Sequence, residues 1–314
     1  GNNMVNNIIP KRSDNEMKSL TAIGLMSGTS MDAIDLAVIE SNGNDEINFG
    51  PSGSVAYSMA ERGLLESAMQ KARLCEGPVP LTGVFAEAAG LVTQKHAYAV
   101  KAFLKEHGLS ARDIDLLGFH GQTILHRPDE KYTCQIGDGR ALARLTSIDV
   151  IGDFRSADMQ AGGQGAPLTP LYHKALSTKL LGKENIAILN LGGVGNVTFI
   201  NAKGILAFDT GPGNALLDDW MMTNTGRPLD AQGETARTGV VDDELLKVWM
   251  SHPYFDKGAP KSLDRQGFAT LGLENLSLED GAATLTAFTV NSILKAEGLL
   301  ETTPTTWIIC GGAR

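Results

Sequence analysis

Apolar and polar residues follow one another along the chain in blocks that predict short strands and longer helices. Residues 22–26 are apolar, residues 27–32 are mostly small and polar, and an apolar, β-branched run resumes at Ala33. This pattern predicts a strand, a glycine-containing turn and a returning strand. Helices are predicted for 61–74 and for 81–107, where apolar residues recur at helical spacing. The chain therefore opens with a hairpin followed by two helices.

Shorter elements complete the first unit. Strands are predicted for Asp115–His120 and Tyr132–Gly137, separated by a loop over 121–129. A short helix at 139–146 and a strand at 147–152 follow. Strands and helices thus alternate through this part of the chain, as expected of an α/β unit.

The same design recurs in the second half of the chain. A glycine-rich stretch at 161–167 leads into a predicted helix at 168–178, and residues 186–200 again form an apolar run, a glycine turn and a β-branched run. The remaining predicted elements are a strand at 205–210, helices at 215–224, 242–250 and 278–297, and a strand at 305–312. The repeated order predicts an internally duplicated α/β fold with mixed sheets.

Length and composition favour a globular, acidic protein of two domains. We predict domains at 18–155 and 156–314, after a disordered tail or tag remnant at 1–17. The formal net charge of −9 comes without a basic run, which argues against nucleic-acid binding. The three cysteines are far apart and match no metal-binding pattern. Because neither a signal peptide nor an apolar run of ~20 residues is visible, we expect a cytoplasmic protein with no membrane partner.

Two glycine-containing turns carry the predicted phosphate contacts. Gly28 lets the backbone approach a ligand closely, and Thr29 and Ser30 with their neighbouring N–H groups can donate to phosphate oxygens. The second turn, at 191–196, offers similar amides. Each turn by itself is also what an ordinary hairpin requires. The two together, with the segments described next, indicate a grip on a triphosphate from both sides.

The segment FDTGPGN, residues 208–214, carries the candidate catalytic group. Asp209 ends an apolar strand, and glycines at 211 and 213 separate it from a predicted helix. A carboxylate at a strand end beside a cleft is well placed to act as a general base. The helix that starts near Asn214 is expected to direct its first N–H groups toward a bound ligand.

Two further segments supply candidate residues for binding a substrate other than the triphosphate. Arg155 can bind an anionic group in a two-pronged geometry, although a surface ion pair would explain the residue equally well. His120, Gln122 and Thr123 lie at the end of a predicted strand and can bind sugar hydroxyls. The alternative for His120 is a core histidine with its hydrogen bonds satisfied.

Seven segments, taken in order, resemble the anhydro-N-acetylmuramic acid kinases. They are GLMSGTSMDAIDLAVIE, GFHGQT, QIGDG, IGDFRSADMQAGGQGAPLTPLYH, LNLGGVGNVTF, FDTGPGNALLDDW and CGGAR, and the match runs from about Ile23 to the last residue. The family belongs to the superfamily of sugar kinases, actin and related chaperone ATPases. The resemblance implies an α/β fold of two duplicated actin-like ATPase (ribonuclease H-like) domains, with mixed sheets and an interdomain cleft.

The resemblance also implies a reaction with ATP and Mg²⁺. Water attacks the anomeric carbon of the anhydro sugar, and the freed 6-oxygen attacks the γ-phosphate of ATP. Asp209 matches the family's catalytic aspartate, which would deprotonate that water, while Asp32 would reach Mg²⁺ through a bound water. The predicted sugar-binding residues are His120, Gln122, Thr123 and Arg155. The predicted nucleotide-binding residues are Gly28, Thr29, Ser30, Met31, Asp32, Ala33, Ile34, Asp35, Gly192, Gly193, Asn196, Gly211, Gly213, Asn214, Gly311 and Gly312.

The sequence departs from the family pattern at a few positions. Ala33 stands where the family usually has glycine, and Ala313 replaces a third glycine of the nucleotide loop. The family continues beyond that loop, so we expect the natural protein to extend past Arg314. Two alternatives stay open: a kinase of the same fold acting on another hexose, and a nucleotide-binding regulator that has lost catalysis. Assembly as a homodimer also stays open.

Overall fold

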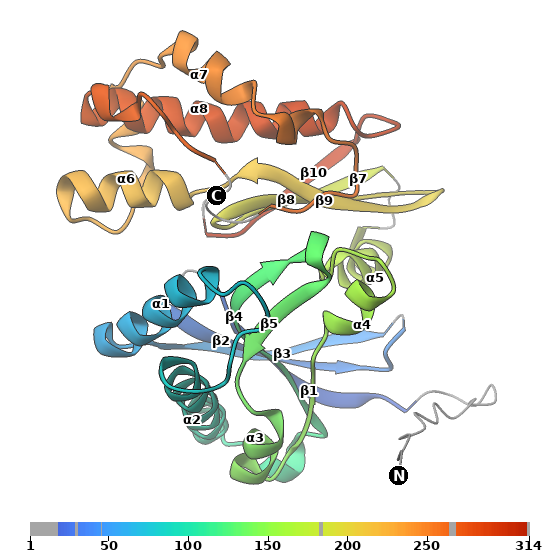
Figure 1. Cartoon of the computed structure of the whole chain (residues 1–314). Coiled ribbons are helices and arrows are strands. Elements are labelled where there is room, and N and C mark those ends of the chain that lie inside the picture. The colour runs from blue at the N-terminus through green and yellow to red at the C-terminus, as the bar shows by residue number, and fades with distance from the viewer. Residues whose placement is uncertain (1–17, 29–30, 45, 182–184, 264–267, 313–314) are drawn as a thin grey trace.

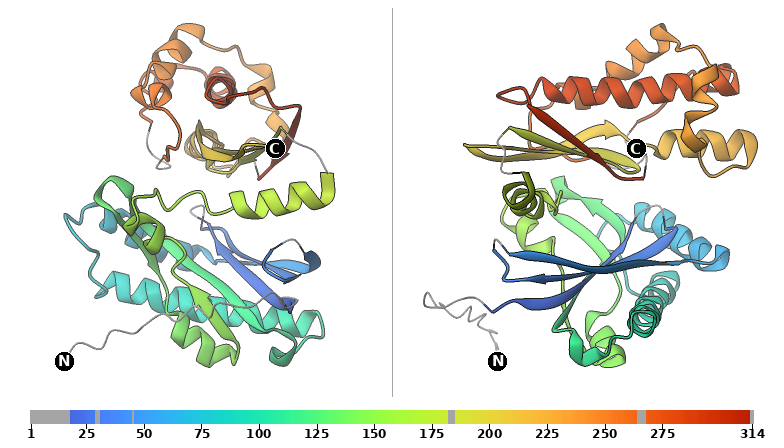
Figure 2. Two further views of the ribbon diagram at one scale, coloured as in Figure 1. Left: turned by 90° about the vertical axis from the view of Figure 1, so that its right-hand side faces the viewer. Right: turned by 180° about the vertical axis from the view of Figure 1, so that it is seen from behind.

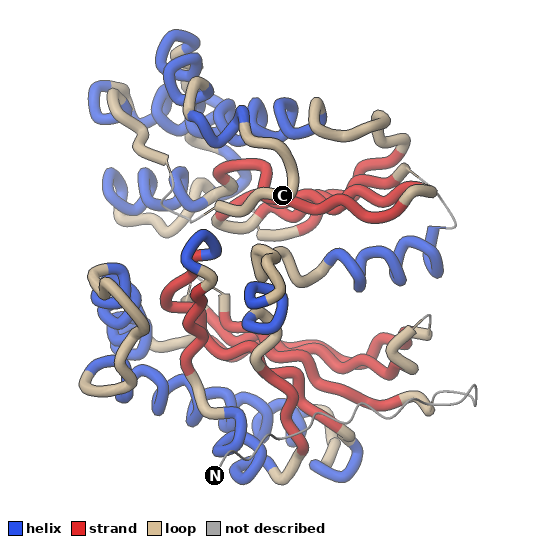
Figure 3. The backbone as a smooth tube through the Cα atoms, turned by 45° about the vertical axis from the view of Figure 1, so that its right-hand side comes forward, coloured by secondary structure: helices blue, strands red, loops and turns tan. Residues whose placement is uncertain are grey.

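The computed structural model describes residues 18–28, 31–44, 46–181, 185–263 and 268–312. The described chain forms two lobes stacked one above the other, each built around its own sheet (Figure 1). The helix α5, Pro170–Leu181, lies between the two sheets in every view (Figure 2). One sheet lies on each side of α5 (Figure 3).

The first lobe contains a six-stranded sheet. Its strands are β1 Leu20–Ser27, β2 Ala33–Ser41, β3 Ile47–Ala56, β4 Leu116–Arg127, β5 Tyr132–Ile136 and β6 Asp149–Gly152. The order is β3-β2-β1-β4-β5, with β6 also paired to β4. Strand β2 runs antiparallel to β1 and β3, whereas β4 runs parallel to β1. This sheet is therefore mixed.

The second lobe repeats that topology in a four-stranded sheet. Its strands are β7 Ile186–Leu191, β8 Val194–Asn201, β9 Gly204–Pro212 and β10 Thr306–Cys310, in the order β10-β7-β8-β9. Strand β8 runs antiparallel to β7 and β9, and β10 runs parallel to β7. Order and directions match β4-β1-β2-β3 of the first sheet, so the duplicated mixed α/β fold predicted from the sequence is confirmed.

Helices cover the sheets and form the cores. The first lobe has α1 Met59–Arg73, α2 Val84–Glu106 and α3 Gly139–Thr146; α4 Ser156–Gln160 precedes α5, and the second lobe has α6 Ala215–Thr225, α7 Asp243–Met250 and α8 Leu278–Glu297. Ser58 and Glu61 form a reciprocal capping box that starts α1. Buried residues of α2 such as Val92 and Phe103 pack with Leu117 of β4 in the first core. No helix in the described part of the chain has the length and hydropathy of a membrane-spanning segment.

Two segments differ from the elements that the sequence predicts. Strand β3 was not predicted because Gly50 and Pro51 interrupt it; they lie where the register with β2 shifts, on an edge strand, which tolerates proline. The loop predicted over 121–129 is wrong for most of its length, since β4 continues to Arg127. At Gly121, where φ is +71°, the register of β4 against β1 is interrupted; Gln122 still pairs with Ser27 of β1, and from Gln122 to Arg127 the strand pairs with β5. Pairing with a distant strand thus overrides the local turn signals.

Candidate active site

Asp209 lies near the end of β9 and is held by three hydrogen bonds from one segment. The backbone N–H of Leu263 donates to Asp209 Oδ2 at 2.7 Å. The N–H of Asp209 donates to the carbonyl of Lys261 at 3.0 Å, and the hydroxyl of Tyr254 donates to the carbonyl of Asp209 at 2.6 Å. One carboxylate oxygen is therefore anchored by a backbone amide.

The surroundings of Asp209 raise its pKa to about 6. Burial is the largest cause, and it outweighs the Leu263 N–H and the positive charge of Arg155, which both act to lower the pKa. The side chain keeps some exposed surface, yet protein surrounds it on most sides. A base whose pKa lies near neutrality combines a large ionised fraction with useful basicity. Asp209 thus has the properties of a general base at physiological pH.

A row of polar residues crosses the second sheet beside Asp209. Asn196 of β8 pairs directly with Asp209, Asn190 of β7 pairs with Asn196, and Cys310 of β10 pairs with Asn190. Directly paired residues point to the same face of a sheet. Thr198, two residues along β8, shares this face. Its hydroxyl lies in hydrogen-bond contact with Nδ1 of His173 in α5, at 2.8 Å. The polar row therefore faces the first lobe.

Asn190 is a member of this row that sequence reasoning missed. The Cys310 thiol donates to Asn190 Oδ1 at 3.8 Å. The sequence carries no local signal for Asn190, because only the register of β7 against β8 brings it into line with Asn196 and Asp209. Asn196, which was predicted to bind nucleotide, stands between the two.

Arg155 and His120 form a connected pair on the first lobe. The Nε–H of Arg155 donates to His120 Nε2 at 2.8 Å, and Nη1 donates to the carbonyl of Gly165 at 2.5 Å. Because a guanidinium only donates, His120 Nε2 must accept, which leaves the proton on Nδ1 facing the carbonyl of Gly121 at 3.0 Å. Burial and the charge of Arg155 lower the pKa of His120 to about 4. His120 is therefore a neutral acceptor that orients Arg155.

Gln122 and Thr123 lie next to this pair and have internal partners. Gln122 is fully buried, accepts from the Ser27 hydroxyl at 2.5 Å and donates to the carbonyl of Gly28 at 3.2 Å. Its amide thus fixes the start of the first glycine turn, and the sugar contact predicted for it stays a prediction. Thr123 is half-buried, and its hydroxyl accepts from Gln135 at 3.1 Å.

The first turn connects β1 to β2. The N–H of Met31 donates to the carbonyl of Gly28 at 3.0 Å, and Met31 is buried with a φ of +55°. Thr29 and Ser30 lie outside the described residues. Asp32 is exposed, and the N–H of Ala33 donates to its Oδ1 at 3.1 Å.

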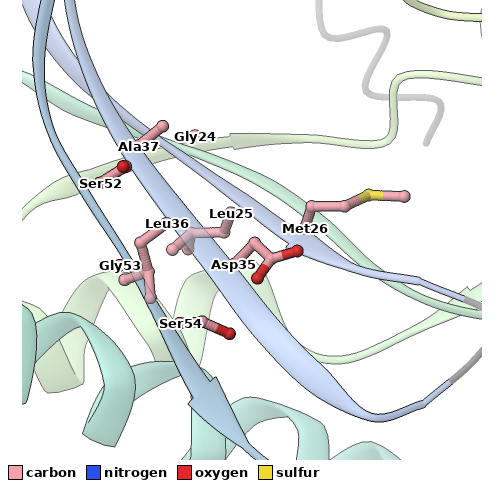
Figure 4. A pocket seen from close by; sticks show the side chains of 9 residues that line it. All are labelled: Gly24, Leu25, Met26, Asp35, Leu36, Ala37, Ser52, Gly53 and Ser54. Carbon is pink, nitrogen blue, oxygen red and sulfur yellow. The ribbon is translucent and has the colours of Figure 1, made fainter. Parts of the chain in front are cut away.

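Two residues predicted to bind nucleotide follow on β2 and point to opposite faces. Ile34 is fully buried in the first core, so only its backbone is available to a ligand. Asp35 is exposed and lines a hollow of about 610 Å³ against β1, β2 and β3 (Figure 4). Met26 and Ser54 reach the same hollow.

The second turn packs against the start of α6. The N–H groups of Gly213 and Ala215 both donate to the carbonyl of Gly193, at 3.0 and 3.3 Å, and the N–H of Asn214 donates to the carbonyl of Gly192 at 2.8 Å. The amides of Asn214 and Ala215 thus have partners in the turn, and the nucleotide contact predicted for Asn214 stays a prediction. The turn and the helix start form one unit.

Glycine is required at several of these positions. A Cβ on Gly211, where φ is +154°, would lie 2.6 Å from Ser292 Cβ of α8. A Cβ on Gly311, where φ is +97°, would lie 2.3 Å from the carbonyl oxygen of Leu191, so the end of β10 runs against the end of β7. Gly312 has open space around it.

We predict that Gly213→Ala separates the second turn from α6. A Cβ at Gly213 would lie 1.9 Å from the carbonyl oxygen of Gly192, and backbone on both sides leaves no side chain to move aside. We expect KM for ATP to rise about tenfold or more, equivalent to at least about 1.4 kcal/mol, and the urea midpoint of unfolding to fall. Gly90→Ala in α2 is the control, because a Cβ there meets open space and alanine favours helix. Equal effects of both substitutions would contradict the prediction.

A magnesium ion near the first turn would be held by few protein ligands. Within the described ranges, no group of three or more His, Cys, Asp or Glu side chains is arranged to hold a metal. Mg²⁺ in phosphoryl-transfer sites typically keeps several waters and uses one or two carboxylates with the substrate phosphates. The exposed Asp32 beside the first turn is compatible with that kind of site.

The predicted interdomain cleft stays a prediction. The hollow beside Asp35 lies on the first sheet, and a second cavity of about 650 Å³ lies between α7 and α8, lined by residues such as Leu246 and Leu294. Neither includes Asp209 or Arg155.

Comparison with known proteins places the chain in a family. The family described as anhydro-N-acetylmuramic acid kinase matches residues 20–314. A protein of that name from Methylobacterium nodulans is 50% identical over 304 residues, covering 93% of this chain and 81% of the relative. One from Zymomonas mobilis is 46% identical over 299 residues, covering 94% and 81%. Among solved structures, an activator of 2-hydroxyisocaproyl-CoA dehydratase from Clostridium difficile is similar with a TM-score of 0.42 and 11% identity, covering 93% of this chain and 80% of that one. The chain belongs to the anhydro-N-acetylmuramic acid kinase family.

Proposed function

We propose that the chain is an ATP-dependent kinase that opens 1,6-anhydro-N-acetylmuramic acid and phosphorylates its 6-oxygen. The observation that carries the proposal is the environment of Asp209: one oxygen anchored by Leu263, a pKa raised to about 6, and Arg155 close enough to act on its charge. The identity of the proposed sugar substrate comes from family membership. The product, N-acetylmuramic acid 6-phosphate, would belong to peptidoglycan recycling in the cytoplasm.

The proposed reaction begins with a water at the carboxylate of Asp209. The carboxylate takes a proton from water while the water oxygen forms a bond to C1 of the sugar. The bond between C1 and O6 breaks, and its electron pair stays on O6. That oxygen attacks the γ-phosphorus of ATP, and the bond from phosphorus to the bridging oxygen breaks to release ADP. One base thus serves both the hydrolytic opening and the phosphoryl transfer.

Arg155 is proposed to bind the lactyl carboxylate of the sugar. His120 and Gly165 occupy two edges of its donor array, through Nε and Nη1. The remaining N–H groups can pair with a substrate carboxylate, since guanidinium carries five donors in a fixed plane. The same positive charge favours the ionised form of Asp209. Arg155 would therefore bind substrate and support the base together.

The two glycine turns are proposed to bind the phosphates of ATP with Mg²⁺. The turn that begins at Gly28 and the turn at Gly192 and Gly193 occupy equivalent places, between β1 and β2 and between β7 and β8. Mg²⁺ would neutralise charge on the transferred phosphoryl group. Asp32 would hold one of its waters.

Incubation with ATP, Mg²⁺ and the anhydro sugar in ¹⁸O-labelled water tests this proposal. We expect one ¹⁸O atom at the anomeric hydroxyl of the sugar phosphate, and ADP in equal amount, as measured by mass spectrometry. An ordinary hexose kinase transfers phosphate to an existing hydroxyl and places no label there. ADP and sugar phosphate without label, or no turnover at all, would overturn the proposal.

A further inference from the structure

The segment from Tyr254 to Leu263 runs along the outer edge of β9, which is the edge strand of the second sheet. The N–H of Asp209 donates to the carbonyl of Lys261, and the N–H of Leu263 returns to Asp209. This alternation is the pattern of a parallel strand pair, in which one residue exchanges bonds with the two neighbours of the residue opposite. In that register, Ser262 stands opposite Asp209.

One bond of this pattern is diverted. In a regular parallel pair the N–H of Leu263 would donate to the backbone carbonyl of Asp209. Here it donates to the carboxylate, Oδ2, at 2.7 Å, and the hydroxyl of Tyr254 occupies the carbonyl at 2.6 Å. The hydroxyl of Tyr254 therefore leaves the amide of Leu263 free to bind the side chain of Asp209.

Tyr254 is itself held rigidly. Its side chain is 4% exposed, and Lys261 is 6% exposed. Nζ of Lys261 donates to the carbonyl of Tyr254 at 3.2 Å and lies 4.5 Å from the centre of the Tyr254 ring. Phe255 and Phe268 pack edge-on against the same ring. A buried lysine and two aromatic rings thus fix the direction of the hydroxyl.

The segment also connects Asp209 to the loop that contacts Arg155. The hydroxyl of Ser262 donates to Gln164 Oε1 at 3.0 Å. Gln164 precedes Gly165, whose carbonyl accepts from Arg155 at 2.5 Å. The amide of Gly165 in turn donates to Asp158 Oδ2 at 2.7 Å. The candidate base and the candidate carboxylate-binding residue are therefore linked through the hydrogen bond between Ser262 and Gln164.

We propose that Tyr254 is a positioning residue for Asp209, because its hydroxyl caps the Asp209 carbonyl and directs the Leu263 amide to the carboxylate. This inference rests on the proposed function of Asp209. With Oδ2 anchored, Oδ1 is the oxygen directed at the attacking water. The bond between Ser262 and Gln164 connects the segment that orients Asp209 to the loop whose Gly165 carbonyl accepts from Arg155.

The charged and titratable groups around Asp209 give the direction of a pH effect. Arg155 faces it from the start of α4 and acts to lower its pKa, as does the Leu263 amide. Burial and, to a smaller extent, the charge of Asp209 raise the pKa of Tyr254, so the hydroxyl keeps its proton. The Nζ of Lys261 binds the Tyr254 carbonyl. Without the Tyr254 hydroxyl, the Leu263 amide is expected to return to the backbone carbonyl, and the pKa of Asp209 then rises.

Tyr254→Phe tests the inference. We expect kcat to fall about tenfold, as for a modest displacement of a catalytic group, with KM for ATP changed less than about twofold. The acid limb of the pH profile of kcat/KM, expected near pH 6 in the unaltered enzyme from the pKa of Asp209, should move to higher pH. Tyr132→Phe is the matched control, because that hydroxyl accepts from the Val79 N–H at 2.8 Å within the first lobe. The Tyr132→Phe variant should leave the acid limb of kcat/KM at its original pH.

The outcomes separate this inference from the proposed function. An unmoved acid limb in Tyr254→Phe would overturn the positioning role, whether or not kcat falls, while the ¹⁸O result would still stand. If Tyr254→Phe does not fold, Lys261→Met removes the bond to the Tyr254 carbonyl and keeps the apolar stem. The same shift of the acid limb is expected there, and its absence would equally contradict the inference.

Discussion

Replacement of Asp209 by Asn is expected to reduce kcat about 10³-fold, within the range for loss of a general base. The amide cannot take a proton from water, yet it keeps an oxygen that can accept from the Leu263 amide. Nucleotide affinity should change little, because the carboxylate binds Leu263 and faces Arg155, whereas the glycine turns are separate backbone features. Steady-state rates and calorimetric titration with a non-hydrolysable ATP analogue measure the two quantities.

Thermal unfolding provides the control for Asp209→Asn. The folded protein raises the pKa of this carboxyl from 3.8 to about 6, so the unfolded chain releases its proton at lower pH than the folded one. Stability contributed at this site falls as pH rises between those values and stays lower above them. The Asn variant carries no such penalty and should unfold at an equal or higher temperature at pH 7.5. Retained turnover in a folded Asn variant would exclude Asp209 as the base.

Arg155→Ala is expected to lower kcat/KM for the anhydro sugar about 10²-fold or more. Removal of one partner from a buried, hydrogen-bonded charge pair has a cost of about 2–5 kcal/mol. Most of the change should appear in KM for the sugar, and KM for ATP should stay nearly constant. Because Arg155 acts to lower the pKa of Asp209, the acid limb should also move to higher pH.

A second substrate and a second arginine make the Arg155 test specific. 1,6-Anhydro-N-acetylglucosamine has no lactyl carboxylate, so preference for the muramic sugar should nearly vanish in Arg155→Ala. Arg127→Ala is the control, because Arg127 donates to the carbonyls of Cys75 and Arg73 at 2.9 and 3.0 Å. It should lower stability and leave substrate preference intact. Preference retained by Arg155→Ala would assign the carboxylate to another residue.

The sequence was sufficient to predict the two hairpins and Asp209 because their signals are local. A strand, a glycine turn and a returning strand lie within about twenty residues each, and Asp209 stands near the end of an apolar strand. Repetition of that order predicted the duplicated sheets. The structure then added the strand order that makes the two halves equivalent.

The partners of Asp209 could not be predicted in the same way. Tyr254 and Leu263 are 45 and 54 positions away along the chain. They come from a segment with neither helical nor strand periodicity. Gln122 shows the same limit, since its amide is directed inward by Ser27, 95 positions away. Polar residues whose partners are this distant give no signal in a single sequence.

Asp209, the proposed base, lies on the edge strand of its sheet, which would couple catalysis to solubility. An unpaired strand edge exposes a row of N–H and C=O groups that can pair with another chain. In this protein the backbone of Lys261 occupies part of that row at Asp209. Any change that detaches the covering residues would free a β-edge for self-association in the same event that releases the carboxylate. Aggregation and inactivation would then share one origin, and suppressors of either defect should map to the same ten residues, 254–263.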